Sequence, residues 1–294
     1  MKLFERVELR ANAKVNLSLD IIGVRPDGMH EVETVMHMVN LNDLVTFERK
    51  NEETGDRRII ITSNRNFIPT GEKNLAYRAA VKVLEDYPNR KDQINIHIQK
   101  RIPVGAGLGG GSSDAAATIK GINSLLKLGM SDKRMSECAA SIGSDVPFLL
   151  GKGACLATGT GTDLKKIPSL KNVGAVLVNP GIFVSTKDVY ALYDTCDIPE
   201  EAHPDTRKLI DAMARNDYDT LIKEMKNVLE IPVFRMYPQI AQLKEELKQG
   251  GCDTALMSGS GSTVYGLSEK YKLLEKIKSH YIEKGYKAFV VNFI

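Results

Sequence analysis

The stretch Pro103-Val104-Gly105-Ala106-Gly107-Leu108-Gly109-Gly110-Gly111-Ser112-Ser113-Asp114 is a glycine-rich loop between a predicted strand and a predicted helix. Residues 94–99, just before it, alternate apolar and polar side chains, which predicts a half-buried strand. The alanine run at 115–117, just after it, favours a helix. Glycines let the backbone approach a ligand closely, and a helix start offers unpaired N–H groups and a positive dipole end. The order strand, loop, helix therefore predicts an anion site, and phosphate is the usual anion.

Three simpler interpretations of this loop are disfavoured. Gly105-x-Gly107-x-x-Gly110 matches the dinucleotide-binding pattern, but a Rossmann unit needs a second parallel strand after the helix. Here a second capped helix, starting at Ser131, follows instead. A Walker A loop would end in Gly-Lys-Ser/Thr, which is absent. Five glycines within seven positions, running directly into Ser112 and Ser113, also argue against a plain turn.

The composition is that of a globular protein. The chain has 294 residues, of which 43% are hydrophobic and 26% charged, so two domains are expected. A net charge of +3 is too small for a nucleic-acid-binding surface, so no nucleic-acid partner is expected. The four cysteines are far apart with no CxxC, which favours reduced thiols over a zinc site or a disulfide framework. No apolar run approaches the roughly 20 residues that span a bilayer, and the start of the chain lacks the apolar region of a signal peptide. We therefore expect a cytoplasmic protein with no membrane association.

The first hundred residues are predicted to be mainly strands. Residues 6–22 are apolar at every second place, which indicates one long strand or a hairpin, with Lys14 and Asn16 on the face opposite the apolar set. A loop at 23–30 contains a Pro-Asp-Gly turn signal, and 31–49 is again strand. The charged stretch 49–58 is expected to be an exposed hairpin, and 59–61 a short buried strand.

Three helices are predicted around the loop. Asn74 is expected to cap the first, which Pro88 ends. The second begins near Ser112 and ends before residue 129, and Ser131 caps the third. Pro147 suits the first turn of a further helix, which places Asp145 at or beside a helix start.

A domain limit is predicted near residue 164, which gives domains 1–164 and 165–294. The second domain is expected to contain strands at 173–178, 254–257, 263–267 and 288–293, with helices from 186, at 238–249 and at 269–284. This order of helices and strands suggests a split βαβ, ferredoxin-like domain. The predicted fold class is therefore α+β with two domains.

Four further motifs, added to the glycine loop, resemble those of the GHMP kinase superfamily over nearly the whole chain. They are Ala13-Lys14-Val15-Asn16-Leu17, Gly23-x-Arg25-x-Asp27-Gly28-x-His30, Ser144-Asp145-Val146-Pro147-Phe148 and Met257-Ser258-Gly259-Ser260-Gly261. The resemblance implies the two-domain GHMP kinase fold, with an N-terminal domain of a type that ribosomal proteins share and a ferredoxin-like C-terminal domain.

The resemblance implies an ATP-dependent small-molecule kinase that uses Mg²⁺ and an alcohol acceptor. The motif at residues 23–30 is similar to that of the branch of the superfamily that acts in the non-mevalonate isoprenoid pathway. That branch phosphorylates the 2-hydroxyl of the erythritol moiety of a cytidine diphospho-sugar alcohol. Another kinase of the superfamily, of homoserine or mevalonate type, is the nearest alternative. An RNA-binding protein with the shared βαβ domain is a more remote one, and a monomer or weak homodimer is expected.

The resemblance also assigns roles in catalysis and ATP binding. It implies that Asp145 takes the proton of the acceptor hydroxyl while Lys14 holds and polarises the pair. From the residues alone, Asp145 could simply cap a helix and Lys14 could be a solvated surface lysine. ATP is expected at Asn74 and at the loop residues Pro103, Val104, Gly105, Ala106, Gly107, Leu108, Gly109, Gly110, Gly111, Ser112 and Ser113. The two serine hydroxyls suit phosphate oxygens or a magnesium ion, for which the sequence shows no dedicated ligand cluster.

The resemblance further implies an acceptor pocket in which His30 binds the cytosine edge and Tyr190 stacks on the ring. The other residues expected in this pocket are Asn16, Met29, Thr186, Gly259 and Ser260. Relatives usually have tyrosine at the position of Met29, so one stacking partner is missing.

Three further charged residues lie at the two ends of the loop. Lys100 and Arg101 could meet phosphates, although two cations at a strand end are more often solvated. Asp114 stands where many relatives have Asn, Ser or Ala. A carboxylate facing the phosphates would repel them, so Asp114 is expected to point away from the phosphates.

Overall fold

The computed structural model describes residues 5–50, 59–89 and 92–294, which form two compact units. Unit 1 consists of Met1–Ala13, Asn42–Ile102 and Gly109–Gly151, and unit 2 of Lys14–Leu41, Pro103–Leu108 and Lys152–Ile294. The units are therefore interleaved along the chain, and the glycine loop passes from unit 2 to unit 1 after Leu108. Residues 51–58 of the predicted exposed hairpin lie outside the described residues.

Two long strands contribute residues to both units. They are β1 (Arg6–Val24) and β2 (His30–Lys50), which pair with each other. The alternating pattern at 6–22 is thus one continuous strand. We did not predict that each of these strands would belong to both units. A periodic pattern shows which side chains are buried, but not which unit they pack against.

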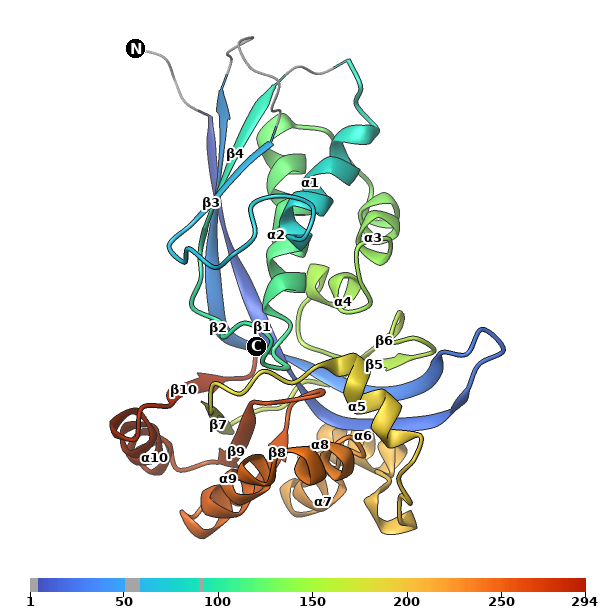
Figure 1. Ribbon diagram of the computed structural model, residues 1–294, viewed down its shortest axis with the longest axis vertical. Helices are drawn as coiled ribbons and strands as arrows, with labels where there is room; N and C mark the ends of the chain where they lie inside the picture. The colour runs from blue at the N-terminus through green and yellow to red at the C-terminus, as the bar shows by residue number, and fades with distance from the viewer. Residues whose placement is uncertain (1–4, 51–58, 90–91) are drawn as a thin grey trace. The chain divides into compact units, whose positions relative to one another are not determined.

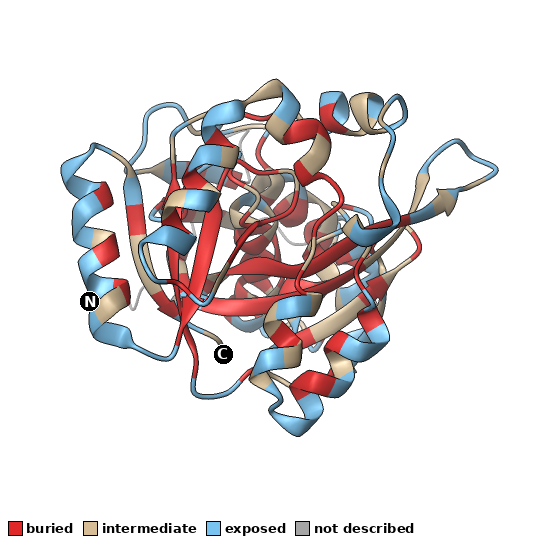
Figure 2. Cartoon of the chain, turned by 90° about the horizontal axis from the view of Figure 1, so that it is seen from below, coloured by how far each residue is buried: buried red, intermediate tan, exposed pale blue. Residues whose placement is uncertain are grey.

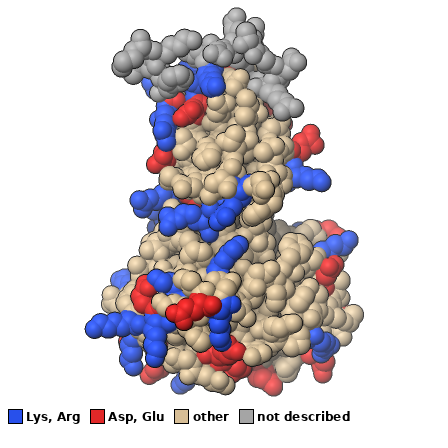
Figure 3. Space-filling model, turned by 60° about the vertical axis from the view of Figure 1, so that its left-hand side comes forward, with Lys and Arg blue, Asp and Glu red and all other residues tan. Residues whose placement is uncertain are grey.

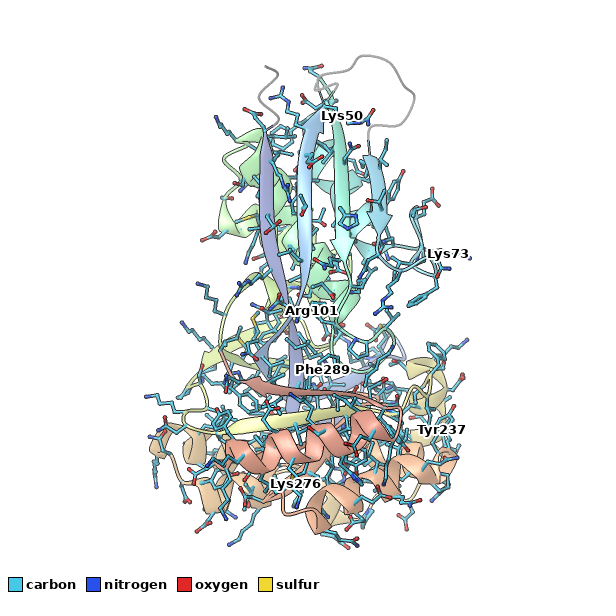
Figure 4. The ribbon with its side chains drawn as sticks, turned by 90° about the vertical axis from the view of Figure 1, so that its left-hand side faces the viewer. Lys50, Lys73, Arg101, Tyr237, Lys276 and Phe289 are labelled. Carbon is cyan, nitrogen blue, oxygen red and sulfur yellow. The ribbon has the colours of Figure 1, made fainter. Side chains whose placement is uncertain are left out.

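The sheet of unit 1 is centred on β4 (Gln93–Gln99), which pairs antiparallel with β2 and parallel with β3 (Ile59–Ser63). Ile94, Ile96 and Ile98 are fully buried, whereas His97 is exposed, so the predicted half-buried strand is confirmed. Polar side chains of β2, β3 and β4 cover the other face of this sheet, which Figure 4 shows.

Four helices complete unit 1. They are α1 (Leu75–Glu85), α2 (Gly110–Leu126), α3 (Asp132–Ala140) and α4 (Val146–Leu150), and α1 and α2 lie side by side (Figure 1). The predicted caps at Asn74 and Ser131 are confirmed. Helix α2 packs closely on the sheet because Gly121 has no side chain, and a Cβ there would lie 2.3 Å from the ring of Phe47. It begins two residues before the predicted start, since Gly109 adopts the left-handed conformation (φ 67°) and forms the N-cap.

Unit 2 contains a four-stranded antiparallel sheet in the order β10-β7-β9-β8. The strands are β7 (Gly174–Asn179), β8 (Thr254–Met257), β9 (Val264–Ser268) and β10 (Lys287–Asn292). This is the strand order of the split βαβ, ferredoxin-like arrangement, which confirms the prediction. Separately, the first half of β2 pairs with β5 (Ala154–Thr158), which pairs with β6 (Asp163–Ile167).

The predicted limit at residue 164 falls inside β6. The assignment of 1–164 and 165–294 as two functional domains remains a prediction, since the compact units of the structure follow a different division.

Helices cover the strands of unit 2 and bury their apolar sides. They are α5 (Thr186–Tyr193), α6 (Thr206–Arg215), α7 (Tyr218–Glu224), α8 (Glu230–Met236), α9 (Pro238–Gln249) and α10 (Tyr271–Glu283), with a short 3-10 helix at Glu200–Ala202. The core residues include Val176, Val178, Ile240, Leu243, Leu274 and Ile277. Figure 2 shows the strands largely buried and the helices buried on one side only.

Three features that the composition addresses can be examined in the structure: surface charge, membrane-spanning helices and cysteines. Most of the face in Figure 3 is neither acidic nor basic, and charged groups of both signs lie near one another in its lower part. Within the described part of the chain, none of the helices combines the length and apolar character needed to cross a bilayer. All four cysteines are described, and all are free thiols.

Candidate active site

The first half of the glycine loop lies in unit 2 and approaches another backbone segment very closely. Gly107 has a φ of 74°, and a Cβ there would lie 2.0 Å from the carbonyl oxygen of Ser258. The Ser258 hydroxyl donates a hydrogen bond to the Gly107 carbonyl (2.9 Å). On the other side, the Lys14 backbone N–H donates to the Leu108 carbonyl (3.0 Å). Glycine is thus required at 107, and the loop is held between β1 and the turn at 258–262.

Lys14 is buried rather than solvated, at 5% exposure, because β1 is covered on both faces at this point. Its Nζ donates to Oδ1 of Asn16 (2.7 Å), and Nδ2 of Asn16 donates to the Thr34 hydroxyl (2.8 Å). Gly259 lies against this pair, since a Cβ there would be 3.5 Å from Nζ of Lys14 and 3.4 Å from Oδ1 of Asn16. The structure therefore brings together the predicted site residues Lys14, Asn16, Gly107 and Gly259.

Two buried side chains that the sequence did not single out support this cluster. Asn227 donates through Nδ2 to the carbonyls of Met257 (2.9 Å) and Gly259 (2.8 Å). The Tyr265 hydroxyl donates to the Asn16 carbonyl (2.8 Å), and burial raises the pKa of Tyr265, so the phenol stays protonated. Neither residue belongs to a motif, and their partners lie far away in the sequence, so no local signal pointed to them.

The second half of the loop lies in unit 1 and forms the start of α2. The Ser113 N–H donates to the Gly109 carbonyl (2.8 Å), and the Ser113 hydroxyl donates to the Asn12 carbonyl (2.7 Å). Ser113 is buried, whereas Gly111 is exposed and Ser112 is half-buried. Of the two predicted serines, Ser112 is the more accessible to a ligand.

Lys100 does not face solvent, so the expectation of a solvated lysine at this strand end was wrong, whereas its contact with a phosphate stays a prediction. The alternation of β4 buries positions 94, 96 and 98 and continues to 100, so the side chain turns into unit 1. Its ammonium donates to Asp43 (2.5 Å) and to Asp114 (2.7 Å). Asp43 also accepts from the backbone N–H of Ile102 (2.9 Å). Arg101 is exposed, as Figure 4 shows. We call Lys100, Asp43 and Asp114 the buried triad.

The buried triad has two carboxylates and one ammonium. Burial opposes the charge on Lys100, but Asp114 and Asp43 raise its pKa above the usual value. Burial raises the pKa of Asp114 to about 7, against the opposing effect of Lys100, and the charge of Asp43 adds to the rise. Oδ1 of Asp114 is buried and has no hydrogen-bond partner. The Asp114 carboxyl group is therefore turned into the interior of unit 1, and burial moves its titration up to the neutral pH range.

Asp145 occupies the N-cap position of α4, with Pro147 in the first turn, as predicted. It has helical backbone angles (φ −77°, ψ −17°), and its side chain makes no capping hydrogen bond. The half-buried carboxylate of Asp145 therefore does not cap the helix. Asn74 shows the opposite behaviour, because Oδ1 accepts from the Ala76 N–H (2.8 Å) and Nδ2 donates to the Pro69 carbonyl (2.7 Å).

Four of the residues predicted for the acceptor pocket meet in two pairs in unit 2. The rings of His30 and Tyr190 have centroids 4.9 Å apart. The hydroxyls of Thr186 and Ser260 are hydrogen-bonded at 2.8 Å. Met29 is 55% exposed. Sequence reasoning missed Tyr193 and Asp194, which follow Tyr190 by three and four residues and contact the His30 ring.

Comparison with known proteins identifies the family. The model for the GHMP kinases N terminal domain matches residues 74–153, and that for the GHMP kinases C terminal domain matches residues 209–287. A 4-diphosphocytidyl-2-C-methyl-D-erythritol kinase of Syntrophomonas wolfei is 45% identical over 279 residues, 94% of this chain and 95% of the relative. The chain belongs to the GHMP kinases. A kinase of the same name from a Geobacillus strain is 43% identical to this GHMP kinase, over 92% of the chain and 91% of the relative.

Solved structures agree with this assignment. A crystal structure of 4-(cytidine 5'-diphospho)-2C-methyl-D-erythritol kinase matches this GHMP kinase with a TM-score of 0.81 and 31% identity, over 98% of this chain and 99% of the other. A homoserine kinase from Cytophaga hutchinsonii matches with a TM-score of 0.77 and 21% identity, over 100% and 96%. The second similarity shows a shared fold. The predicted superfamily, fold class and kinase activity are thus confirmed.

Proposed function

We propose that this GHMP kinase transfers the γ-phosphoryl group of ATP to the 2-hydroxyl of 4-diphosphocytidyl-2-C-methyl-D-erythritol, in the non-mevalonate isoprenoid pathway. The observation that carries the proposal is the 45% identity, over 94% of the chain, to a relative named for this substrate. The contact between His30 and Tyr190 supports it, because these are the two residues expected to bind a cytosine ring.

We propose that ATP places its phosphates on the glycine loop, residues 103–113, with Asn74 beside the adenine. Gly105, Gly107 and Gly109 all have positive φ (62°, 74° and 67°), a conformation that exposes successive backbone N–H groups to an anion. The start of α2 adds its dipole. Asn74 contributes to this site through the position of α1, since both polar atoms of its side chain are bonded to backbone groups.

Magnesium bound to the triphosphate would neutralise phosphate charge during transfer. Mg²⁺ usually binds through phosphates, waters and one or two protein groups, and the half-buried Ser112 hydroxyl is a suitable protein ligand. Among the residues that the structure describes, no group of three or more His, Cys, Asp or Glu side chains is arranged to hold a metal ion. We therefore propose that the magnesium ion enters the site bound to the nucleotide.

We assign the proton transfer to Asp145 and the polarisation of the reacting groups to Lys14. In the reaction, the bond from the γ-phosphorus to the ADP oxygen breaks and a bond to the 2-oxygen forms. The hydroxyl proton passes to the Asp145 carboxylate. Two observations support these roles: Asp145 stands at the start of α4, where the helix dipole favours a carboxylate, and the Lys14 ammonium is held in place by Asn16.

For the acceptor, we propose that His30 and Tyr190 bind the cytosine. Asn16, Met29, Thr186, Gly259 and Ser260 would complete the pocket. The proposed partner is thus this small molecule, with no nucleic acid or membrane involved. We also propose a monomer or weak homodimer in the cytoplasm, where ATP is available.

The test is turnover of Asp145→Asn with 4-diphosphocytidyl-2-C-methyl-D-erythritol and ATP, measured by ADP release. Loss of a general base lowers kcat by about 10²–10⁴. The matched control is Asp132→Asn, which removes another carboxylate at a helix start, that of α3. Near-native turnover of Asp145→Asn would contradict the assigned base. Homoserine and mevalonate as alternative acceptors, and salt-dependent RNA binding without ATP turnover, test the two rival functions.

A further inference from the structure

A carboxylate at the end of α5 holds the ring of His30, at the start of β2. Nε2 of His30 lies 2.7 Å from Oδ1 of Asp194, 164 residues further along the chain. Tyr190 and Tyr193 lie against the same ring, with centroids 4.9 Å and 6.2 Å away. The His30 side chain is 15% exposed. The imidazole is therefore fixed in orientation by one polar contact and two aromatic ones.

The contact with Asp194 also determines which ring nitrogen carries the proton. An ionised carboxylate only accepts hydrogen bonds, so Nε2 of His30 must be the donor. In a neutral imidazole the other nitrogen, Nδ1, then has a free lone pair and is a hydrogen-bond acceptor. We propose that Asp194 is a positioning residue that makes Nδ1 of His30 an acceptor, and that this acceptor selects cytosine over uracil. The inference rests on the proposed function, in which His30 binds the pyrimidine.

The chemistry of the two bases explains the selection. Cytosine has an amino group at carbon 4, which donates, where uracil has a carbonyl oxygen, which only accepts. A carbonyl oxygen facing the Nδ1 lone pair would leave two acceptors together without a proton between them. An unsatisfied polar group in a binding site weakens binding, and sites built on a required hydrogen bond discriminate strongly against analogues that lack it.

The exposure of Asp194 argues against a mainly stabilising role. Its side chain is 51% exposed, and ion pairs at such exposed sites contribute little to the stability of the fold. The role of Asp194 is therefore its effect on the His30 ring, since an exposed carboxylate can still fix the tautomer of a histidine that it contacts. Nothing requires Asp194 to touch the reacting atoms, so its loss should alter the choice of base rather than the transfer step.

The test compares kcat/KM for the cytidine substrate and for its uridine counterpart in wild type and Asp194→Asn. We expect the cytidine preference to fall by about tenfold or more, mainly through a higher KM for the cytidine substrate, because an amide both donates and accepts and permits either tautomer. The KM for ATP should not change. Asp197→Asn, an exposed carboxylate three residues on, is the matched control. Asp194→Glu, which keeps the carboxylate, should restore part of the preference.

A second measurement detects the tautomer directly. Nitrogen-15 NMR should show the wild-type His30 ring protonated at Nε2, and a mixture of tautomers in Asp194→Asn. An unchanged base preference in Asp194→Asn, or an Nδ1-protonated ring in the wild type, would overturn the inference. Equal turnover of both substrates by the wild type would overturn it too while leaving the proposed function intact. Turnover of neither would overturn the proposed function and this inference with it.

Discussion

The buried triad of unit 1 and the His30–Asp194 pair of unit 2 each join a basic group to a carboxylate across a long stretch of chain. They differ in burial. The side chains of Lys100, Asp43 and Asp114 are 5%, 0% and 6% exposed, whereas Asp194 is 51% exposed. Water screens the second contact and not the first. Contacts of similar length can therefore stabilise the fold at a buried position and orient a side chain at an exposed one.

The free-energy cost of breaking each contact depends on how deeply the contact is buried. Removing one partner of a buried ion pair leaves an uncompensated charge, which costs about 3–5 kcal/mol. Breaking an exposed pair costs about 0–1 kcal/mol. The triad should therefore respond strongly in unfolding experiments and the pair weakly, although the pair is proposed to matter more for the choice of substrate.

The largest effect is expected for Lys100→Met, which leaves Asp43 and Asp114 buried without a cation. The free energy of unfolding should fall by about 3–5 kcal/mol in urea titrations followed by circular dichroism. The control is Lys276→Met on α10, an exposed lysine that Figure 4 labels, which should stay within about 0.5 kcal/mol of wild type. A loss below about 1 kcal/mol for Lys100→Met would remove the contrast between the two regions.

An effect no larger than that of Lys100→Met, but spread over several pH units, is expected for Asp114→Asn. Folding raises the pKa of Asp114 from 3.8 to about 7, so the folded state holds a proton that the unfolded state releases in this window. This contribution to stability is complete below about pH 4 and is lost as pH rises to about 7, at up to about 1.4 kcal/mol per pH unit. Asn cannot titrate, so the variant should lose this slope.

The slope is measured as the difference in unfolding free energy between wild type and Asp114→Asn at several pH values from 4 to 8. A difference that stays constant over this range would mean that Asp114 remains ionised in the folded protein. The triad would then carry two full negative charges against one positive charge.

The smallest effect on stability is expected for Asp194→Asn. Because its carboxylate is half exposed, the unfolding free energy should change by less than about 1 kcal/mol. Urea titration of the same protein samples used for the base-preference assay gives this value. A loss comparable to that of Lys100→Met would make Asp194 a structural residue and would weaken its role as a specificity determinant.

The sequence predicted the features that depend on neighbours along the chain. The caps at Asn74 and Ser131, the alternating strand at 94–99 and the ferredoxin-like order of unit 2 are all confirmed, because local geometry and periodicity encode them. The GHMP kinase motifs likewise predicted the family. Lys100 was misjudged although the alternation of β4 extends to it, since burial of the lysine depends on two carboxylates, of which Asp43 lies 57 residues earlier and Asp114 lies 14 residues later.

Contacts between distant segments could not be predicted in this way. Asp194 is 164 residues from His30, and no pattern within α5 distinguishes it from other exposed carboxylates. The sequence indicated that Gly107 permits close approach, but the approaching group, the Ser258 carbonyl, lies 151 residues away. The start of α2 was misplaced because Gly109 gave no sign that it would serve as the cap.

The close approach at Gly107 has a consequence for protein engineering. The carbonyl of Ser258 occupies the space of a side chain at 107, and the Ser258 hydroxyl bonds back to the same residue. Neither segment can accept a new shape unless the other changes with it. A chimera built from two kinases of this family should therefore take residues 103–108 and 258–262 from the same parent, although 151 residues separate Gly107 from Ser258.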